Sequence, residues 1–112
     1  MKKRGILNAQ LSYLLAALGH KDLFMIGDAG MPIPEGVEVV DLVLTAGVPT
    51  FKQVLDAVLD EVQVEGYYLA HEIKEFNPEL EEYIKAGLPE AEVEYMPHGD
   101  LKKFSGKCRF AI

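Results

Sequence analysis

The chain has 112 residues, a length typical of one domain with one hydrophobic core, so we predict a single domain over residues 1–112. Its composition, 49% hydrophobic and 26% charged residues, excludes a disordered or collagen-like chain, and no apolar run approaches the roughly 20 residues of a membrane-spanning helix. The 11 basic and 18 acidic residues give a net charge of −7, without the basic patch typical of nucleic-acid-binding proteins. We therefore expect a soluble domain that binds neither nucleic acid nor a membrane.

The first predicted element is a helix that Asn8 caps and that Gly19 ends in a left-handed conformation. Four leucines at helical spacing predict its apolar face: Leu11, Leu14, Leu15 and Leu18. The basic residues before this helix loosely imitate a signal peptide, but polar residues interrupt the apolar stretch. We therefore expect a cytoplasmic protein.

Short apolar runs alternate with helical patterns along the rest of the chain. The predicted strands cover residues 23–26, 39–44, 67–70, 93–96 and 108–112. Strands that alternate with helices predict an α/β fold, a three-layer α-β-α arrangement with a largely parallel central sheet.

The helices between these strands have recognisable first residues. Thr50 and Gln53 form a capping box, and Asn77 followed by Pro78 is typical of a cap and a first-turn proline. A short helix is predicted after the fourth strand. Residues 72–94 contain eight glutamates and two lysines, which we interpret as a solvent-exposed helix surface.

Several motifs of known chemistry are absent. The glycines form neither a dinucleotide fingerprint nor a phosphate loop, and no serine lies in a nucleophile elbow. His71 and Glu72 begin a zincin-like motif, but Glu75 occupies the place of its second histidine. The single cysteine, Cys108, lies in an apolar segment and is predicted to be a buried, unreactive thiol. We therefore expect no metal site and no cofactor.

Three histidines and one aspartate remain as candidates for chemistry. His20 follows the first helix, and Asp28 lies where the first strand becomes a loop. His71 and His98 each follow a strand, and ligands of open α/β sheets bind at the carboxyl ends of strands. Imidazole titrates near neutral pH, so these residues together suggest a histidine/carboxylate site for proton transfer. Each could instead have a local role, as a helix cap, a turn residue or a half-buried core histidine.

Matching motifs are spread over nearly the whole chain: Lys2-Lys3, Gly5-Ile6-Leu7-Asn8, Leu18-Gly19-His20, Asp28-Ala29-Gly30, Pro32, Pro34-Glu35-Gly36, Asp41-Leu42, Gly47-Val48-Pro49, Phe51, Glu72-Ile73-Lys74, Asn77, Glu94-Tyr95 and His98. In these motifs the sequence resembles the D-ribose pyranases, mutarotase-type isomerases of the ribose-uptake system. The L-fucose mutarotases share the Leu-Gly-His and loop-aspartate pattern, but the Asp28-Ala29-Gly30 stretch with its two prolines is more similar to the ribose branch.

The resemblance implies an isomerase that interconverts the pyranose and furanose forms of ribose by acid–base ring opening and reclosure, without a cofactor. It implies that His20 is the general acid and that Asp28 and His98 contact the substrate. It also implies a homo-oligomeric ring, such as a decamer, with sites shared between neighbouring subunits.

The family resembled here continues past the position of Ile112 with a Thr-Gly-Glu turn and a Thr-Pro-Tyr-x-Asn segment, whose tyrosine and asparagine also hold the sugar. We therefore expect little turnover from the 112 residues alone and activity in a chain extended through that segment. Two alternatives remain open. One is a sugar-binding or assembly protein of the same fold with impaired turnover, and the other is a mutarotase acting on another sugar such as L-fucose.

Overall fold

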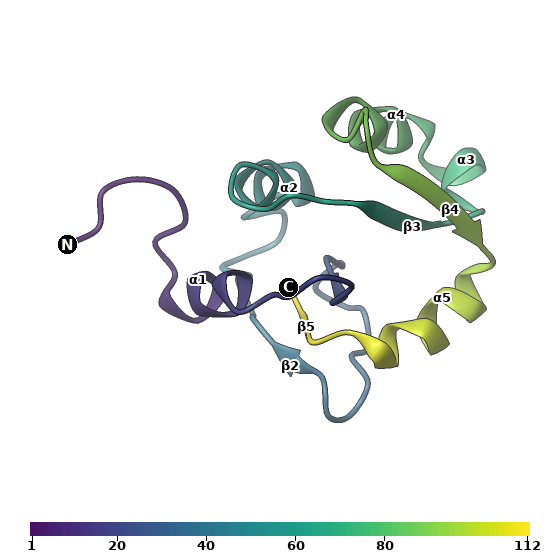
Figure 1. The fold of residues 1–112 in the computed structure, drawn as a ribbon. Helices are drawn as coiled ribbons and strands as arrows, with labels where there is room; N and C mark the ends of the chain where they lie inside the picture. Colours follow the sequence, from purple (N-terminus) through teal and green to yellow (C-terminus); the bar gives the residue numbers. More distant parts are fainter. The chain divides into compact units, whose positions relative to one another are not determined.

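A computed structural model describes residues 1–112, and within it the chain forms two compact units (Figure 1). The first unit comprises Met1–Val62 with Ser105–Ile112, and the second comprises Gln63–Phe104. Every strand ladder in both units is parallel, so the predicted α/β fold with a largely parallel sheet is confirmed. The single domain over residues 1–112 stays a prediction.

The first unit contains a small parallel sheet with the last strand of the chain at its centre. Its elements are α1 (Ala9–Ala16), β1 (Phe24–Met25), β2 (Glu38–Val39), α2 (Phe51–Leu59), the 3-10 helix η1 (Ser105–Lys107) and β5 (Phe110–Ala111). The strand order is β1-β5-β2. Backbone hydrogen bonds extend the β1–β5 pairing beyond the named strands, from the Arg109 N–H to the Leu23 carbonyl (2.7 Å) and from the Gly27 N–H to the Ile112 carbonyl (3.0 Å).

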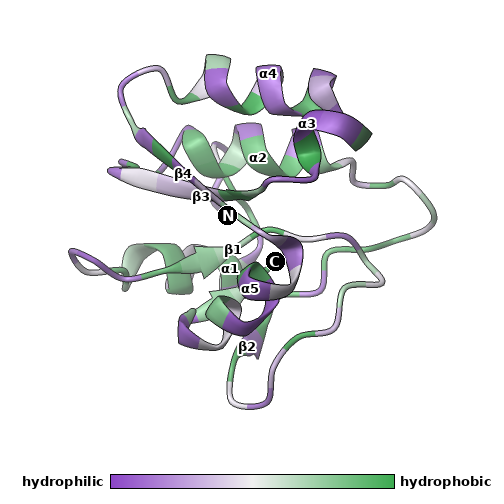
Figure 2. Ribbon diagram, turned by 90° about the vertical axis from the view of Figure 1, so that its right-hand side faces the viewer, coloured by the Kyte–Doolittle hydropathy of each residue, from purple (hydrophilic) through white to green (hydrophobic).

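The core of this unit forms around β5. Phe110 and Ala111 are completely buried, and the ring of Phe110 stacks on that of Phe24 with 5.2 Å between centroids. The buried residues of the same cluster come from α1, α2 and the loops: Ile6, Leu11, Leu15, Val40 and Val58. Figure 2 shows α1 and β1 largely in the green of hydrophobic residues. The central strand of the sheet is therefore also the most buried one.

The first helix begins as predicted and ends earlier than predicted. The Asn8 side chain accepts a hydrogen bond from the Leu11 N–H at 2.8 Å, which makes it the N-cap. The helix ends at Ala16, however, and the left-handed residue after it is Lys21 (φ 71°), not Gly19. The prediction for Gly19 was wrong because its N–H is bound by the side chain of Asp22, outside the helix.

The second strand is much shorter than the predicted 39–44. The ladder ends where the Val40 N–H donates to the Ala111 carbonyl, after which the Asp41 side chain accepts a hydrogen bond from the Val43 N–H. This local Asx turn takes the backbone away from the sheet and leaves Val43 and Leu44 exposed. The apolar residues that follow the strand are the reason that the sequence predicted a longer one.

The second unit is a two-stranded parallel sheet with helices on both faces. Its elements are β3 (Gly66–Ala70), α3 (Ile73–Phe76), α4 (Pro78–Gly87), β4 (Glu92–Met96) and α5 (His98–Phe104). Tyr95 of β4 contacts Glu81 of α4, and Tyr68 of β3 packs edge-on against Phe104 of α5. Tyr68 pairs with the neighbour of Tyr95, so these two tyrosines point to opposite faces, with α4 on one side and α5 on the other (Figure 1).

Two helix starts confirm their sequence signals. Thr50 and Gln53 make the reciprocal capping box of α2, and Asn77 caps α4 with Pro78 in its first turn. The predicted exposed acidic surface is present on α4, where Glu79 and Glu82 are exposed and the ribbon is largely purple in Figure 2. No helix is both long enough and apolar enough to cross a bilayer.

Candidate functional site

His20 lies in a tight turn, not at the end of a helix. Three residues separate it from the last residue of α1, so the field of that helix end has little influence on it. The turn runs from Gly19 to Asp22, closed by a hydrogen bond from the Asp22 N–H to the Gly19 carbonyl (3.2 Å). Lys21 has the positive φ that the third residue of a type II turn requires, at a cost of roughly 1–2 kcal/mol for a residue other than glycine. The helix-end role considered for His20 is therefore not supported.

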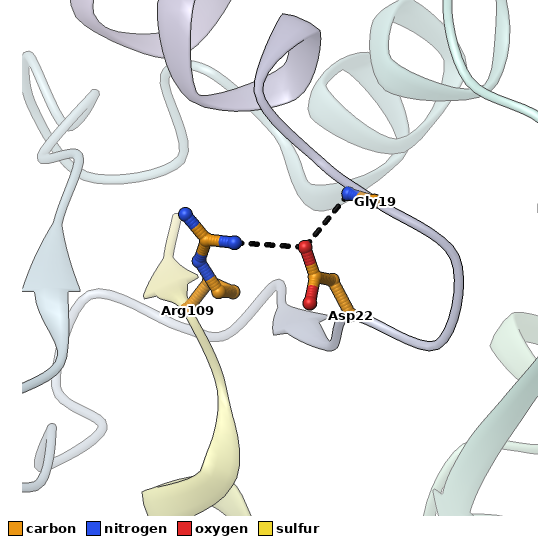
Figure 3. A network of polar contacts seen from close by, with 3 residues as sticks. All are labelled: Gly19, Asp22 and Arg109. Atoms are coloured by element: carbon orange, nitrogen blue, oxygen red, sulfur yellow. Dashed lines mark hydrogen bonds and ion pairs between the residues drawn. The ribbon is translucent and has the colours of Figure 1, made fainter.

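The carboxylate of Asp22 ties this turn to the start of β5 (Figure 3). Its Oδ2 atom accepts one hydrogen bond from the Gly19 N–H at 2.7 Å and another from the Arg109 guanidinium at 2.8 Å. The two charged partners are 87 positions apart in the sequence. A carboxylate with an arginine and a backbone N–H makes charge-assisted hydrogen bonds, the stronger kind in proteins.

Asp28 lies just beyond the carboxyl end of β1, in an exposed loop. The loop begins with a second turn, in which the Met31 N–H donates to the Asp28 carbonyl at 3.0 Å. The strand before it is held to β5 through Gly27. An exposed carboxylate at the carboxyl end of a parallel strand is typical of a ligand contact.

His98 is the first residue of α5 and follows β4, as the sequence predicted. Its backbone N–H donates to the Glu72 carboxylate, with both oxygens at 3.1 Å, while the Leu101 N–H donates to the Pro97 carbonyl. Glu72 thus caps the helix that carries His98, and the histidine ring is on an exposed residue. The sequence did not identify this capping role of Glu72.

His71 follows β3 at the same edge of the two-stranded sheet as His98. It is exposed, not the half-buried core histidine considered from the sequence, and its ring stacks on Tyr95 at 5.8 Å. The Lys74 ammonium lies over the same tyrosine ring, 4.1 Å from its centroid, and the Tyr95 hydroxyl donates to Glu81. This hydrogen bond lowers the pKa of Glu81. A separate hydrogen bond of Lys85 with Tyr95 raises the pKa of Lys85, and the charge of Glu81 raises it further. These contacts fasten α4 to β4.

Cys108 is half-buried, and burial raises the pKa of its thiol above the ordinary value. Because the thiolate is the reactive form, we expect iodoacetamide at pH 7 to modify the folded protein at least about tenfold more slowly than the urea-unfolded chain. The two rates can be compared by mass spectrometry. Equal rates would contradict a shielded, unreactive thiol.

The family model described as the RbsD / FucU transport protein family matches residues 1–112. The chain belongs to this family. The D-ribose pyranase of Limosilactobacillus fermentum is 52% identical over 112 residues, which are all of this chain and 86% of that relative. The D-ribose pyranase of Pediococcus pentosaceus is 47% identical over 108 residues, 96% of this chain and 82% of that protein.

A solved member of the RbsD / FucU family has the same fold. The structure of Bacillus subtilis RbsD complexed with D-ribose superposes with a TM-score of 0.95 and 39% sequence identity, covering 100% of this chain and 86% of that one. The resemblance to D-ribose pyranases seen in the sequence is thus confirmed.

The three predicted site residues of this RbsD / FucU chain are divided between its two units. His20 and Asp28 belong to the first unit and flank the two ends of β1, whereas His98 belongs to the second unit. Their convergence on one sugar stays a prediction. The long-range partner Arg109 was missed, because no local pattern links an arginine to an aspartate 87 positions away.

Proposed function

We propose that the chain is a D-ribose pyranase, an isomerase that interconverts the pyranose and furanose forms of ribose. The observation that carries the proposal is full-length similarity to D-ribose pyranases, at 52% identity over all 112 residues for the L. fermentum protein. The similarity to the RbsD complex with D-ribose supports ribose as the ligand.

The reaction breaks the bond between the anomeric carbon and the ring oxygen and forms a new one to another hydroxyl, and the catalyst needs only to transfer protons. The pyranose opens when its ring oxygen gains a proton and the anomeric hydroxyl loses one, and the furanose forms when a different hydroxyl attacks the resulting aldehyde. A positioned imidazole can donate the first proton and later accept one, which is typically worth about 10²–10⁴-fold in rate.

In the proposed site His20 is the general acid, and Asp28 and His98 hold the sugar. Asp28 suits this role because its exposed carboxylate can accept charge-assisted hydrogen bonds from sugar hydroxyls. His98 suits it because the Glu72 cap fixes its backbone while its side chain is free to face a ligand from an exposed position. His20 suits it because its turn is held in place from both ends.

The proposal includes a homo-oligomeric ring with shared sites, located in the cytoplasm. Exposed apolar residues at the end of β2 and in the segment after it support an interface between subunits, since lone domains rarely expose such clusters. These residues are Val39, Val43, Leu44 and Val48.

Saturation-transfer NMR on the anomers of D-ribose, with L-fucose measured in parallel, tests the activity. We expect little exchange from the 112 residues alone, whereas the chain extended through the family's C-terminal segment should raise exchange between the ribose ring forms above the rate in buffer and affect L-fucose less. Faster exchange of L-fucose would reassign the substrate. If calorimetry detects ribose binding but exchange is no faster than in buffer, the chain is a sugar-binding protein and not an isomerase.

Asp28→Ala is expected to weaken ribose binding by about 10- to 100-fold, the effect of losing a charged hydrogen-bond partner. Titration calorimetry measures the affinity, and Asp60→Ala, which removes another exposed aspartate, is the control. Unchanged ribose affinity in a folded Asp28→Ala protein would remove Asp28 from the site.

A further inference from the structure

The turn that carries His20 is closed by one backbone hydrogen bond. It lies outside α1 and β1, its closing backbone hydrogen bond is long at 3.2 Å, and Lys21 holds a conformation that non-glycine residues disfavour. Such a turn needs side-chain contacts to keep one conformation.

Two side-chain contacts of this turn meet at one atom. Oδ2 of Asp22 accepts from the Gly19 N–H on one side and from the Arg109 guanidinium on the other (Figure 3). The first hydrogen bond closes the turn across His20. The second connects it to a different part of the chain.

Arg109 is itself fixed by its backbone. Its N–H donates to the Leu23 carbonyl at 2.7 Å, and the next residue, Phe110, is completely buried in the central strand β5. The arginine side chain therefore extends to the turn from the buried central strand of this unit. Because the side chains of Arg109 and Asp22 remain 54% and 26% exposed, the pair contributes little to overall stability. The pair instead fixes the conformation of the turn that it joins to β5.

We propose that Asp22 and Arg109 are positioning residues for His20: they hold its turn against β5 so that the imidazole meets the sugar in one orientation. This inference rests on the proposed function, in which His20 transfers the proton. A displacement of about 1 Å of a catalytic group can cost on the order of 10²-fold in rate. Asp22 makes both contacts and Arg109 only one, so loss of Asp22 has the larger effect.

The test compares Arg109→Gln, Asp22→Ala and the double variant, with Arg4→Gln as a control that removes an exposed arginine far from the turn in sequence. The first readout is the NMR order parameter of the backbone amides of residues 19–21, which needs no activity. The second is kcat and KM for ribose exchange, in the 112-residue chain or in the chain extended through the family's C-terminal segment. Arg109→Lys tests whether a conservative cation restores the wild-type values, and thermal melting checks that each variant is folded.

We expect order parameters near the rigid value of about 0.85 in the wild type and a clear fall toward about 0.6 in the variants. The kcat should fall roughly tenfold for Arg109→Gln and 10- to 100-fold for Asp22→Ala, with KM nearly unchanged and partial recovery in Arg109→Lys. The double variant should be no slower than Asp22→Ala, because both residues act through one contact.

The proposal would be overturned if the order parameters of residues 19–21 in Arg109→Gln and Asp22→Ala equalled those of the wild type. It would also be overturned if these order parameters fell while kcat stayed unchanged. If neither the 112-residue chain nor the extended chain accelerates ribose exchange without any substitution, the proposed function is refuted instead. In that case the order parameters still decide whether the pair fixes the turn.

Discussion

Replacing His20 with alanine is expected to slow the exchange between ribose pyranose and furanose by about 10²-fold or more, while ribose affinity changes little. The reason is that ring opening needs a proton at the ring oxygen, and the variant lacks the group that delivers it. Saturation-transfer NMR gives the exchange rate, and calorimetry gives the affinity. The structure favours this outcome because His20 lies in a turn fixed to the sheet and not at a helix end.

His71→Ala is the matched control for this prediction, since it removes an exposed histidine that contacts Tyr95. It should leave ribose exchange unchanged. If His20 served only the local structure, its replacement would leave exchange as it was. That result would remove His20 from the mechanism.

Phe110→Ala is expected to lower the free energy of unfolding by about 3–5 kcal/mol. Phe110 is completely buried in the central strand β5, and its ring stacks on Phe24, so truncation leaves a cavity between neighbours that cannot all collapse into it. Since small domains are stable by only about 5–15 kcal/mol, the variant should be close to unfolding. Urea denaturation followed by circular dichroism measures the loss.

Phe76→Ala provides the control, because this phenylalanine is 79% exposed at the end of α3. Its truncation should change stability by no more than about 0.5 kcal/mol. Equal losses in the two variants would mean that β5 is not the centre of the core.

Helix starts could be predicted from the sequence because a cap needs only residues a few positions apart. Asn8, Thr50 and Asn77 each accept a hydrogen bond from an N–H three positions later, so the pattern is visible in any short window. The end of the first helix could not be predicted in this way. The side chain of Asp22 diverts the Gly19 N–H, and a partner 87 positions away holds Asp22.

Strand lengths were less predictable than strand positions. All five predicted strands exist, but the segment 39–44 pairs only near its start, because an aspartate turn competes with the ladder at Asp41. The apolar residues of that segment predicted a longer strand, although several of them are exposed.

The candidate site was predicted in part. Placement of histidines and an aspartate at strand ends suggested proton-transfer chemistry, and the family resemblance gave roles to His20, Asp28 and His98. The residues that hold them could not be found, because Arg109 and Glu72 act through contacts with distant parts of the chain. Such contacts follow from the fold and not from local sequence.

The most direct test of proton transfer by His20 is chemical rescue of His20→Ala with free imidazole, measured as ribose exchange in the 112-residue chain and in the chain extended through the family's C-terminal segment. We predict that imidazole restores part of the lost exchange in His20→Ala, beyond the rate that the same imidazole produces in buffer alone or adds to His71→Ala. Exchange at the wild-type rate in His20→Ala without imidazole would contradict the account.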